Sequence, residues 1–218
     1  MKVYYLPKKI QALAFDMDLT LYTSPEYGQY QIDCLVKKLA ERRGLSFDEM
    51  NRELDEKRKE WAVSHNGKKP SLSNLLIFCY GVSMEENVRW RAEIYEPEKF
   101  LCEDVRLASA LERLSRSFTL GVVTNNPVSM ARRTLAALGV GEFLPVIVGL
   151  DTCMIAKPHR LPFEKFCLLT GCPPETCVSI GDRYEVDLDL PMEMGMGGIL
   201  VNGAEDVYEL PKVLGIIE

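Results

Sequence analysis

Residues 10–20 of the chain read IQALAFDMDLT, and this stretch decides the fold class. It begins with a short apolar run over residues 10–15 and continues into two acidic residues, Asp16 and Asp18. A continuous apolar run of this length is typical of a parallel strand that is covered on both faces. Ligands of open α/β sheets bind beyond the carboxyl ends of such strands. The stretch therefore predicts a buried strand with two carboxylates at the end where ligands bind.

Further apolar runs occur later in the chain, and helical patterns separate them. The runs cover residues 118–123, 146–148, 178–180 and 198–201. The helical patterns cover residues 104–116, 128–138, 162–170 and 188–194. Repeated strand–helix units with right-handed crossovers build a doubly wound sheet. We therefore predict an α/β fold with a Rossmann-like, doubly wound parallel sheet as its core.

The chain between the first and second runs has a different rhythm, because helical patterns follow one another there with no strand between them. An apolar helical face ends at Gly44. Ser46 and Ser83 each begin a further helix, with a Glu three residues later at capping-box spacing. Another helix is expected over residues 71–80. This region is an insertion, and the expected domains are an α/β core over residues 1–23 and 101–218 and an α-helical cap over residues 24–100.

Polar residues follow the other apolar runs as they follow the first. Thr124, Asn125 and Asn126 come after the second run, and Lys157 comes shortly after the third. The fourth run leads into Gly181-Asp182-Arg183 and then to Asp187 and Asp189. Parallel strands place their carboxyl ends at one edge, so these side chains are expected to gather there. We expect Asp189 to be a helix-start charge and His159 a loop residue rather than a catalyst.

The residue types at this edge suit phosphate chemistry. Asp16, Asp182 and Asp187 concentrate negative charge, which is costly unless a cation such as Mg²⁺ offsets it. Lys157 supplies a compact positive charge, and Thr124 supplies a hydroxyl for phosphate oxygens. Asp16 is then placed to attack phosphorus as a nucleophile. Asp18 is placed to protonate the leaving oxygen and later to activate water.

The segments FDMDLT, VVTNN, AKP and GDRYEVD resemble the four motifs of the haloacid dehalogenase superfamily, in its phosphatase branch. The resemblance implies that Asp16 is the nucleophile, and that Asp18 is the acid/base and faces the metal with its backbone carbonyl. It implies that Thr124 and Lys157 bind phosphate, with Asn125 beside them in substrate binding. It implies a helical cap of type 1 and a Mg²⁺ site whose residues are Asp16, Asp18, Asp182 and Asp187. Asp187 either supports the metal site or supports Lys157.

The third motif departs from the family pattern, which often continues as KPxP. Here it reads Lys157-Pro158-His159-Arg160, with a further proline at Pro162. Because the lysine is present, we expect the departure to change the shape of the following loop rather than the chemistry.

These features predict a Mg²⁺-dependent phosphatase that hydrolyses a small organic phosphomonoester, a nucleotide or sugar phosphate, through an aspartyl-phosphate. FDMDLTLY somewhat resembles pyrimidine 5′-nucleotidase-like members of the family, which makes a nucleoside monophosphate the first substrate to test. A haloacid dehalogenase has no need of Asp18 or of the metal-binding acids, which argues against that activity.

Three other activities stay open. A phosphonatase would need a cap lysine, for which Lys68 or Lys69 are candidates. A phosphoglucomutase-like enzyme would protect the aspartyl-phosphate from water. A non-enzymatic phospho-acceptor switch would also combine an Asp, a Thr, a Lys and an acidic metal site, but such modules are shorter and have no helical cap.

Composition excludes several other classes of protein. The chain has 218 residues and a formal net charge of −6, which argues against a nucleic-acid polymer as partner. No apolar run approaches the roughly 20 residues that span a bilayer, and no export signal is expected. An odd number of cysteines, 7, favours a reduced, cytoplasmic protein. Cys167, Cys172 and Cys177 recur every five residues but lack zinc-site spacing, so we expect buried side chains. A monomer or homodimer is expected.

Overall fold

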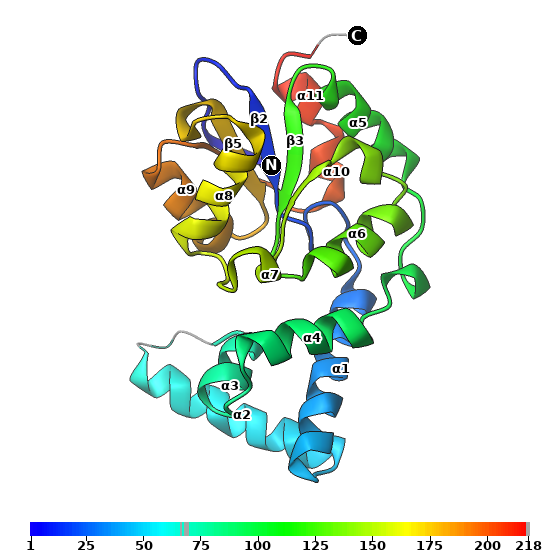
Figure 1. Ribbon diagram of the computed structural model, residues 1–218, viewed down its shortest axis with the longest axis vertical. Helices are drawn as coiled ribbons and strands as arrows, with labels where there is room; N and C mark the ends of the chain where they lie inside the picture. Colours follow the sequence, from blue (N-terminus) through cyan, green and yellow to red (C-terminus); the bar gives the residue numbers. More distant parts are fainter. Residues whose placement is uncertain (66, 68–69, 217–218) are drawn as a thin grey trace. The chain divides into compact units, whose positions relative to one another are not determined.

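A six-stranded sheet forms the centre of the computed structural model, which describes residues 1–65, 67 and 70–216 (Figure 1). The strand order is β1-β6-β5-β2-β3-β4. The strands are Lys2–Tyr5 (β1), Ala12–Phe15 (β2), Thr119–Val123 (β3), Val146–Val148 (β4), Cys177–Gly181 (β5) and Gly197–Leu200 (β6). β1 pairs with β6 in the antiparallel sense, and every other pair is parallel. The predicted parallel sheet is confirmed, and it carries an additional antiparallel edge strand.

The central strands are buried along their whole length, as their continuous apolar sequences predicted. Every residue of β2 and β5 is buried. β2 lies between β3 and β5, with Ala14 paired to Gly121 on one side and to Ser179 on the other. A Cβ at Gly121 would lie 2.5 Å from the carbonyl oxygen of Val146, so only glycine fits where β3 meets β4. The parallel pairing of β2 with β3 and with β5 brings the ends of these three strands to one edge.

Helices cover both faces of the sheet. α8 and α9 lie on one side, and α5, α10 and α11 lie on the other (Figure 1). The helices are Val105–Ser115 (α5), Val128–Ala137 (α6), Leu150–Cys153 (α7), Arg160–Thr170 (α8), Asp189–Glu193 (α9), Ala204–Tyr208 (α10) and Leu210–Val213 (α11). Short 3₁₀ turns occupy Pro97–Lys99, Gly141–Phe143 and Pro174–Thr176. Coverage on both faces is the doubly wound arrangement expected from the alternating pattern.

The chain divides into two compact units. We call the first the sheet unit; it comprises Met1–Ser24 and the chain from Glu96 onward. The second, Pro25–Tyr95, we call the helical unit. Its helices are Pro25–Arg43 (α1), Phe47–Ser64 (α2), Leu72–Phe78 (α3) and Met84–Ile94 (α4).

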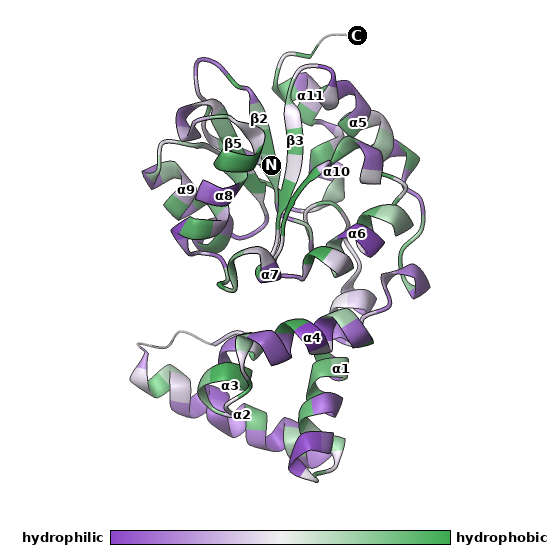
Figure 2. Ribbon diagram, in the orientation of Figure 1, coloured by the Kyte–Doolittle hydropathy of each residue, from purple (hydrophilic) through white to green (hydrophobic). Residues whose placement is uncertain are grey.

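Serine caps begin three of the four helices of the helical unit. The side chains of Ser46, Ser71 and Ser83 each accept a hydrogen bond from a backbone N–H of the first turn. Ser46 and Glu49 form the predicted capping box. Gly44 has a φ of +67° after α1, a conformation that favours glycine and ends the helix. The predicted helices are confirmed. Figure 2 shows many hydrophilic residues along α2 and a hydrophobic β2.

The three regularly spaced cysteines lie in the core of the sheet unit. Cys167, Cys172 and Cys177 are buried in one cluster with Phe163 and Phe166. The sulfur atoms of Cys167 and Cys177 are 3.9 Å apart, and all seven cysteines are free thiols. Within the described ranges they form no three-ligand metal group. The prediction that these cysteines are buried side chains is confirmed.

Several elements differ from the sequence prediction or were not predicted. β1 is exposed at all four positions, so its sequence carries no burial pattern that marks a strand. The single helix predicted over residues 188–194 is instead a π-turn over Tyr184–Leu188 followed by the short α9. The short helices α7, α10 and α11 were also not predicted. None of the helices in the described part of the chain is long and apolar enough to cross a membrane.

Candidate active site

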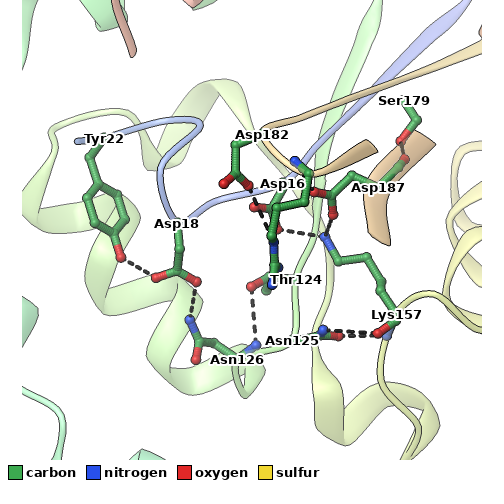
Figure 3. A network of polar contacts seen from close by, with 11 residues as sticks. Asp16, Asp18, Tyr22, Thr124, Asn125, Asn126, Lys157, Ser179, Asp182 and Asp187 are labelled. Carbon is green, nitrogen blue, oxygen red and sulfur yellow. Dashed lines mark hydrogen bonds and ion pairs between the residues drawn. The ribbon is translucent and has the colours of Figure 1, made fainter. Parts of the chain in front are cut away.

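The carboxyl ends of the parallel strands bring the predicted site residues together. Asp16 directly follows β2, Thr124 directly follows β3, and Asp182 directly follows β5. Lys157 lies in the loop between α7 and α8. The close-up in Figure 3 shows these side chains gathered at one place. The loops that contribute them are far apart in sequence, and the sheet is what places them side by side.

The centre of the site is a buried ammonium between two buried carboxylates. Lys157 Nζ lies 2.6 Å from Asp16 Oδ1 and 2.7 Å from Asp187 Oδ1 (Figure 3). The exposed fractions of the three side chains are only 1–3%. Removing a charge from water costs several kcal/mol per ion, and a close hydrogen-bonded partner offsets that cost. Lys157 therefore depends on both carboxylates for its stability, and each carboxylate depends on Lys157.

Burial shifts the ionisation of these groups. Burial raises the pKa of Asp16 to about 7, and the negative charges of Asp187 and Asp18 act in the same direction, while Lys157 opposes them. Burial also disfavours the ammonium of Lys157, but the two carboxylates outweigh it and hold the pKa of Lys157 above its ordinary value. Burial likewise raises the pKa of Asp182. The site therefore holds more carboxylate charge than its single lysine neutralises.

Asp187 is positioned by a π-turn and by a glycine. The turn over Tyr184–Leu188 lets Asp187 Oδ2 accept the N–H of Arg183 at 3.1 Å. Ser179 Oγ donates to the backbone carbonyl of Asp187 at 2.6 Å. A Cβ at Gly181 would lie 2.4 Å from the Cβ of Asp187, so this approach requires glycine. Single π-turns within helical segments are frequent at functional sites, and this one aims Asp187 at Lys157.

Three acidic residues form a group that fits a divalent cation. Ligand oxygens of Asp16, Asp182 and Asp187 lie within 4.8 Å of one another, and no other group of at least three His, Cys, Asp or Glu side chains in the described residues does so. Asp16 Oδ2 and Asp182 Oδ1 are buried without a hydrogen-bond partner in the described chain. Arg183 Nε lies 3.7 Å from Asp182 Oδ1, too far for a hydrogen bond.

The carboxylate oxygens without a hydrogen-bond donor indicate which acids would bind the ion directly. Both oxygens of Asp187 already have donors, Lys157 and the Arg183 N–H, so Asp187 supports Lys157. Mg²⁺ prefers carboxylate oxygens and water. Asp16 and Asp182 therefore fit as its direct protein ligands.

Asp18 takes a different direction from Asp16. Its Oδ1 accepts a hydrogen bond from the Tyr22 hydroxyl, and its Oδ2 accepts one from Asn126 Nδ2 at 2.7 Å. Figure 3 shows the Asp18 carboxylate facing Tyr22 and Asn126. Its side chain is outside the group formed by the other three acids. A contribution of the Asp18 backbone carbonyl to a metal site stays a prediction.

Thr124 and Asn125 are both at the site, but in different surroundings. Thr124 is buried, and its Oγ1 accepts the N–H of Asn126 at 3.2 Å. Asn125 Oδ1 accepts the N–H of Lys157 at 2.7 Å, and its Nδ2 donates to the Lys157 carbonyl at 3.3 Å. The side chain of Asn125 thus holds the backbone that carries the lysine. Its predicted part in substrate binding stays a prediction.

Four residues that build the site were given no role in the sequence analysis, although Asn126 and Arg183 were placed at this edge. Tyr22 and Asn126 hold Asp18, and Ser179 and Arg183 hold Asp187. Asn126 and Arg183 lie within the quoted motifs VVTNN and GDRYEVD, and Tyr22 is the last residue of FDMDLTLY, so their positions after strands were the available signal. Ser179 lies within an otherwise apolar strand, so its position gave no sign of a role in the site.

His159 and Asp189, which were also named in the sequence analysis, lie at the starts of helices. His159 begins α8, where its Nδ1 accepts the N–H of Leu161 at 3.1 Å. Asp189 is exposed and is the first residue of α9, as expected. Lys68 and Lys69, the candidate cap lysines, lie outside the described residues.

Comparison with known proteins identifies relatives of this chain. Residues 10–190 match the model of the haloacid dehalogenase-like hydrolases. A glyceraldehyde 3-phosphate phosphatase of Methanopyrus kandleri is 28% identical over 195 residues, which cover 86% of this chain and 82% of that protein. A phosphoglycolate phosphatase of Xylella fastidiosa is 40% identical over 76 residues, which cover 35% of this chain and 33% of that protein.

A solved structure shares the fold. The crystal structure of a phosphatase from Thermococcus onnurineus superposes with a TM-score of 0.64 at 22% identity, covering 94% of this chain and 98% of that one.

Replacing Lys157 tests the buried charge cluster. We expect Lys157→Met to lose about 3–5 kcal/mol of unfolding free energy at about pH 7.5, because two buried carboxylates lose their partner. Without the ammonium, the folded protein binds more protons than the unfolded chain, so the loss should shrink toward about pH 5.5. Urea unfolding followed by circular dichroism at both pH values measures this. Lys212→Met, at an exposed lysine, is the control, and an equal loss at both pH values would contradict the prediction.

Proposed function

The chain belongs to the haloacid dehalogenase-like hydrolase family, in its phosphatase branch, and from that premise we propose that it is a Mg²⁺-dependent phosphatase that acts through an aspartyl-phosphate on Asp16. The observation that carries the proposal is the buried bridge from Lys157 to Asp16 and Asp187, next to the unsatisfied Asp16 Oδ2. A carboxylate fixed by an ammonium and placed beside a cation site suits attack on a phosphate ester.

In the first step Asp16 attacks phosphorus. A new bond forms between a carboxylate oxygen of Asp16 and phosphorus, and the bond from phosphorus to the alcohol oxygen breaks. Lys157 fixes the plane of the Asp16 carboxylate through Oδ1 and brings positive charge to the phosphoryl oxygens. The Thr124 hydroxyl binds a phosphoryl oxygen in this proposal. Protonated Asp18 gives its proton to the leaving alcohol oxygen.

In the second step water attacks the phosphorus of the aspartyl-phosphate. The Asp18 carboxylate takes the proton of this water, the bond between Asp16 and phosphorus breaks, and inorganic phosphate leaves. Asp16 and protonated Asp18 are then restored for the next cycle. The reaction consumes one water for each ester and needs no redox partner.

Asp16 and Asp182 would hold the Mg²⁺ ion, with Asp187 behind them. The support is the pair of buried carboxylate oxygens that lack a donor, together with the raised pKa values of Asp16 and Asp182. When bound, the ion supplies positive charge that neutralises the acids and the phosphate. Lys157 and Arg183 leave this charge only partly neutralised.

We propose further that the helical unit is the cap of this family and selects the alcohol part of the substrate. The curated relatives named above act on glyceraldehyde 3-phosphate and phosphoglycolate, which supports small phosphorylated metabolites as substrates. A nucleoside monophosphate is the next candidate. We propose a cytoplasmic location, which the seven free thiols support. We propose a monomer or homodimer as the oligomeric state.

The activity is tested by phosphate release from a panel of esters. We expect Mg²⁺-dependent release from at least one of glyceraldehyde 3-phosphate, phosphoglycolate and a nucleoside monophosphate. Asp16→Asn should lower the rate by on the order of 10⁴-fold or more, because the nucleophile is lost. Asp189→Asn, at an exposed aspartate outside the site, is the control and should keep the wild-type rate. Wild-type activity of Asp16→Asn would contradict the mechanism, and no release from any ester would contradict the function.

Mg²⁺ binding should release protons in a pH-dependent way. Because the metal-free pKa of Asp16 is raised to about 7, this group is mostly protonated at about pH 6, and a bound cation must displace its proton. We expect about one proton per ion at about pH 6, falling toward zero by about pH 8.5, with affinity rising over the same range. Calorimetry in two buffers of different ionisation enthalpy measures the release.

The controls separate Asp16 from the rest of the protein. Asp16→Asn should lose both the proton release and most of the affinity, whereas Asp189→Asn should retain both. Equal affinity and no proton release at both pH values would show that Asp16 does not bind the ion.

A further inference from the structure

Two buried side chains hold the carboxylate of Asp18, one on each oxygen. The Tyr22 hydroxyl donates to Oδ1, and Asn126 Nδ2 donates to Oδ2 at 2.7 Å (Figure 3). Tyr22 lies in the loop after β2, and Asn126 lies between β3 and α6. The two donors thus come from separate loops, and they fix the plane of the carboxylate from two directions.

Both donors are themselves held in place. Tyr22 is 6% exposed and Asn126 is 3% exposed, whereas Asp18 is half-buried. The backbone of Tyr22 forms a bridge with the backbone of Asp18. A donor that is buried and fixed orients its acceptor better than an exposed one, since little ordering remains to be done during the reaction.

Asn126 is fixed at its backbone on both sides. Its N–H donates to Thr124 Oγ1 at 3.2 Å, and its carbonyl accepts the N–H of Leu150 at 2.9 Å. The amide that reaches Asp18 is therefore tied to the same loop that carries Thr124. A shift of this loop would move Asp18 and Thr124 together.

We propose that Tyr22 and Asn126 are positioning residues for Asp18, and that they set how well the enzyme cleaves esters of poor leaving groups. The proposal rests on the proposed function, in which Asp18 protonates the leaving oxygen. An alkyl alcohol leaves as a strongly basic alkoxide and needs that proton as its bond to phosphorus breaks. A p-nitrophenolate is a weak base and leaves without it. The positioning of Asp18 should thus matter for alkyl phosphates and hardly for aryl phosphates.

The quantity that reports this is kcat/KM for formation of the aspartyl-phosphate. It covers the steps up to release of the first product, so it is independent of the later attack by water, in which Asp18 acts on every substrate alike. The ratio of kcat/KM for an alkyl phosphate to kcat/KM for p-nitrophenyl phosphate isolates the proton transfer. General damage to the fold lowers both values and leaves the ratio unchanged.

The experiment compares Tyr22→Phe and Asn126→Ala with the wild type on two substrates. The alkyl substrate is whichever of glyceraldehyde 3-phosphate, phosphoglycolate and the nucleoside monophosphate is hydrolysed fastest, and the aryl substrate is p-nitrophenyl phosphate. We expect each variant to lower the alkyl-to-aryl ratio about tenfold, and Asp18→Asn to lower it about 100-fold. Matched controls remove the same kinds of hydrogen bond elsewhere: Tyr208→Phe, at a tyrosine that donates to Asp104, and Asn202→Ala, at an asparagine that donates to Asp206. Both should leave the ratio unchanged.

The possible outcomes distinguish the positioning proposal from the proposed acid role of Asp18. If Asp18→Asn lowers the ratio while Tyr22→Phe and Asn126→Ala do not, the positioning proposal is wrong and the acid role of Asp18 stands. A ratio that rises in Tyr22→Phe would also overturn it, because the hydroxyl would then restrain Asp18 rather than aim it. If Asp18→Asn leaves the ratio unchanged, the acid role itself is wrong, and the positioning proposal fails with it.

Discussion

The ion bridge from Lys157 to Asp16 and Asp187 is the interaction on which the rest of the site depends. The Lys157 side chain, with an exposed fraction of 1%, keeps its charge at this depth only because a carboxylate oxygen lies within 2.7 Å of Nζ on each side. Each of the two carboxylates is tolerated in turn because the ammonium lies beside it. Much of the surrounding structure positions these three side chains. Asn125 holds the backbone of Lys157, the π-turn and Ser179 aim Asp187, and β2 carries Asp16 to the edge.

The bridge also explains how two aspartates only two residues apart take different parts in the proposed reaction. Asp16 is buried, faces Lys157 and keeps one oxygen without a donor. Asp18 is half-buried and faces Tyr22 and Asn126 with both of its oxygens. Carboxylates in unlike surroundings can act as nucleophile and as acid/base in one site. Here the surroundings differ because each side chain meets donors from a different loop.

Much of this fold was readable from the sequence, for physical reasons. Strands buried on both faces carry unbroken apolar runs, so β2, β3, β4, β5 and β6 could be predicted. Serine caps and Gly44 marked the helices of the helical unit. By contrast, β1 is an exposed edge strand that owes its conformation to pairing with β6, and its own residues give no signal. The π-turn depends on contacts of Asp187 with distant residues, which no local pattern encodes.

In the site, too, some residues could be predicted from the sequence and others could not. Asp16, Lys157, Asp182 and Asp187 were predicted from their places after strands, because parallel strands share one edge. The contacts of Asn125 with Lys157 and of Tyr22 with Asp18 depend on how loops meet, and they became visible only in the structure.

The central claim is that the phosphoryl group of the substrate is transferred to Asp16. The most direct measurement is borohydride reduction of the enzyme during turnover, followed by mass spectrometry of its peptides, because hydride converts an aspartyl-phosphate to homoserine. The account predicts homoserine at position 16, dependent on substrate and on Mg²⁺. Homoserine at another aspartate, or turnover that leaves Asp16 unreduced at every time point, would contradict it.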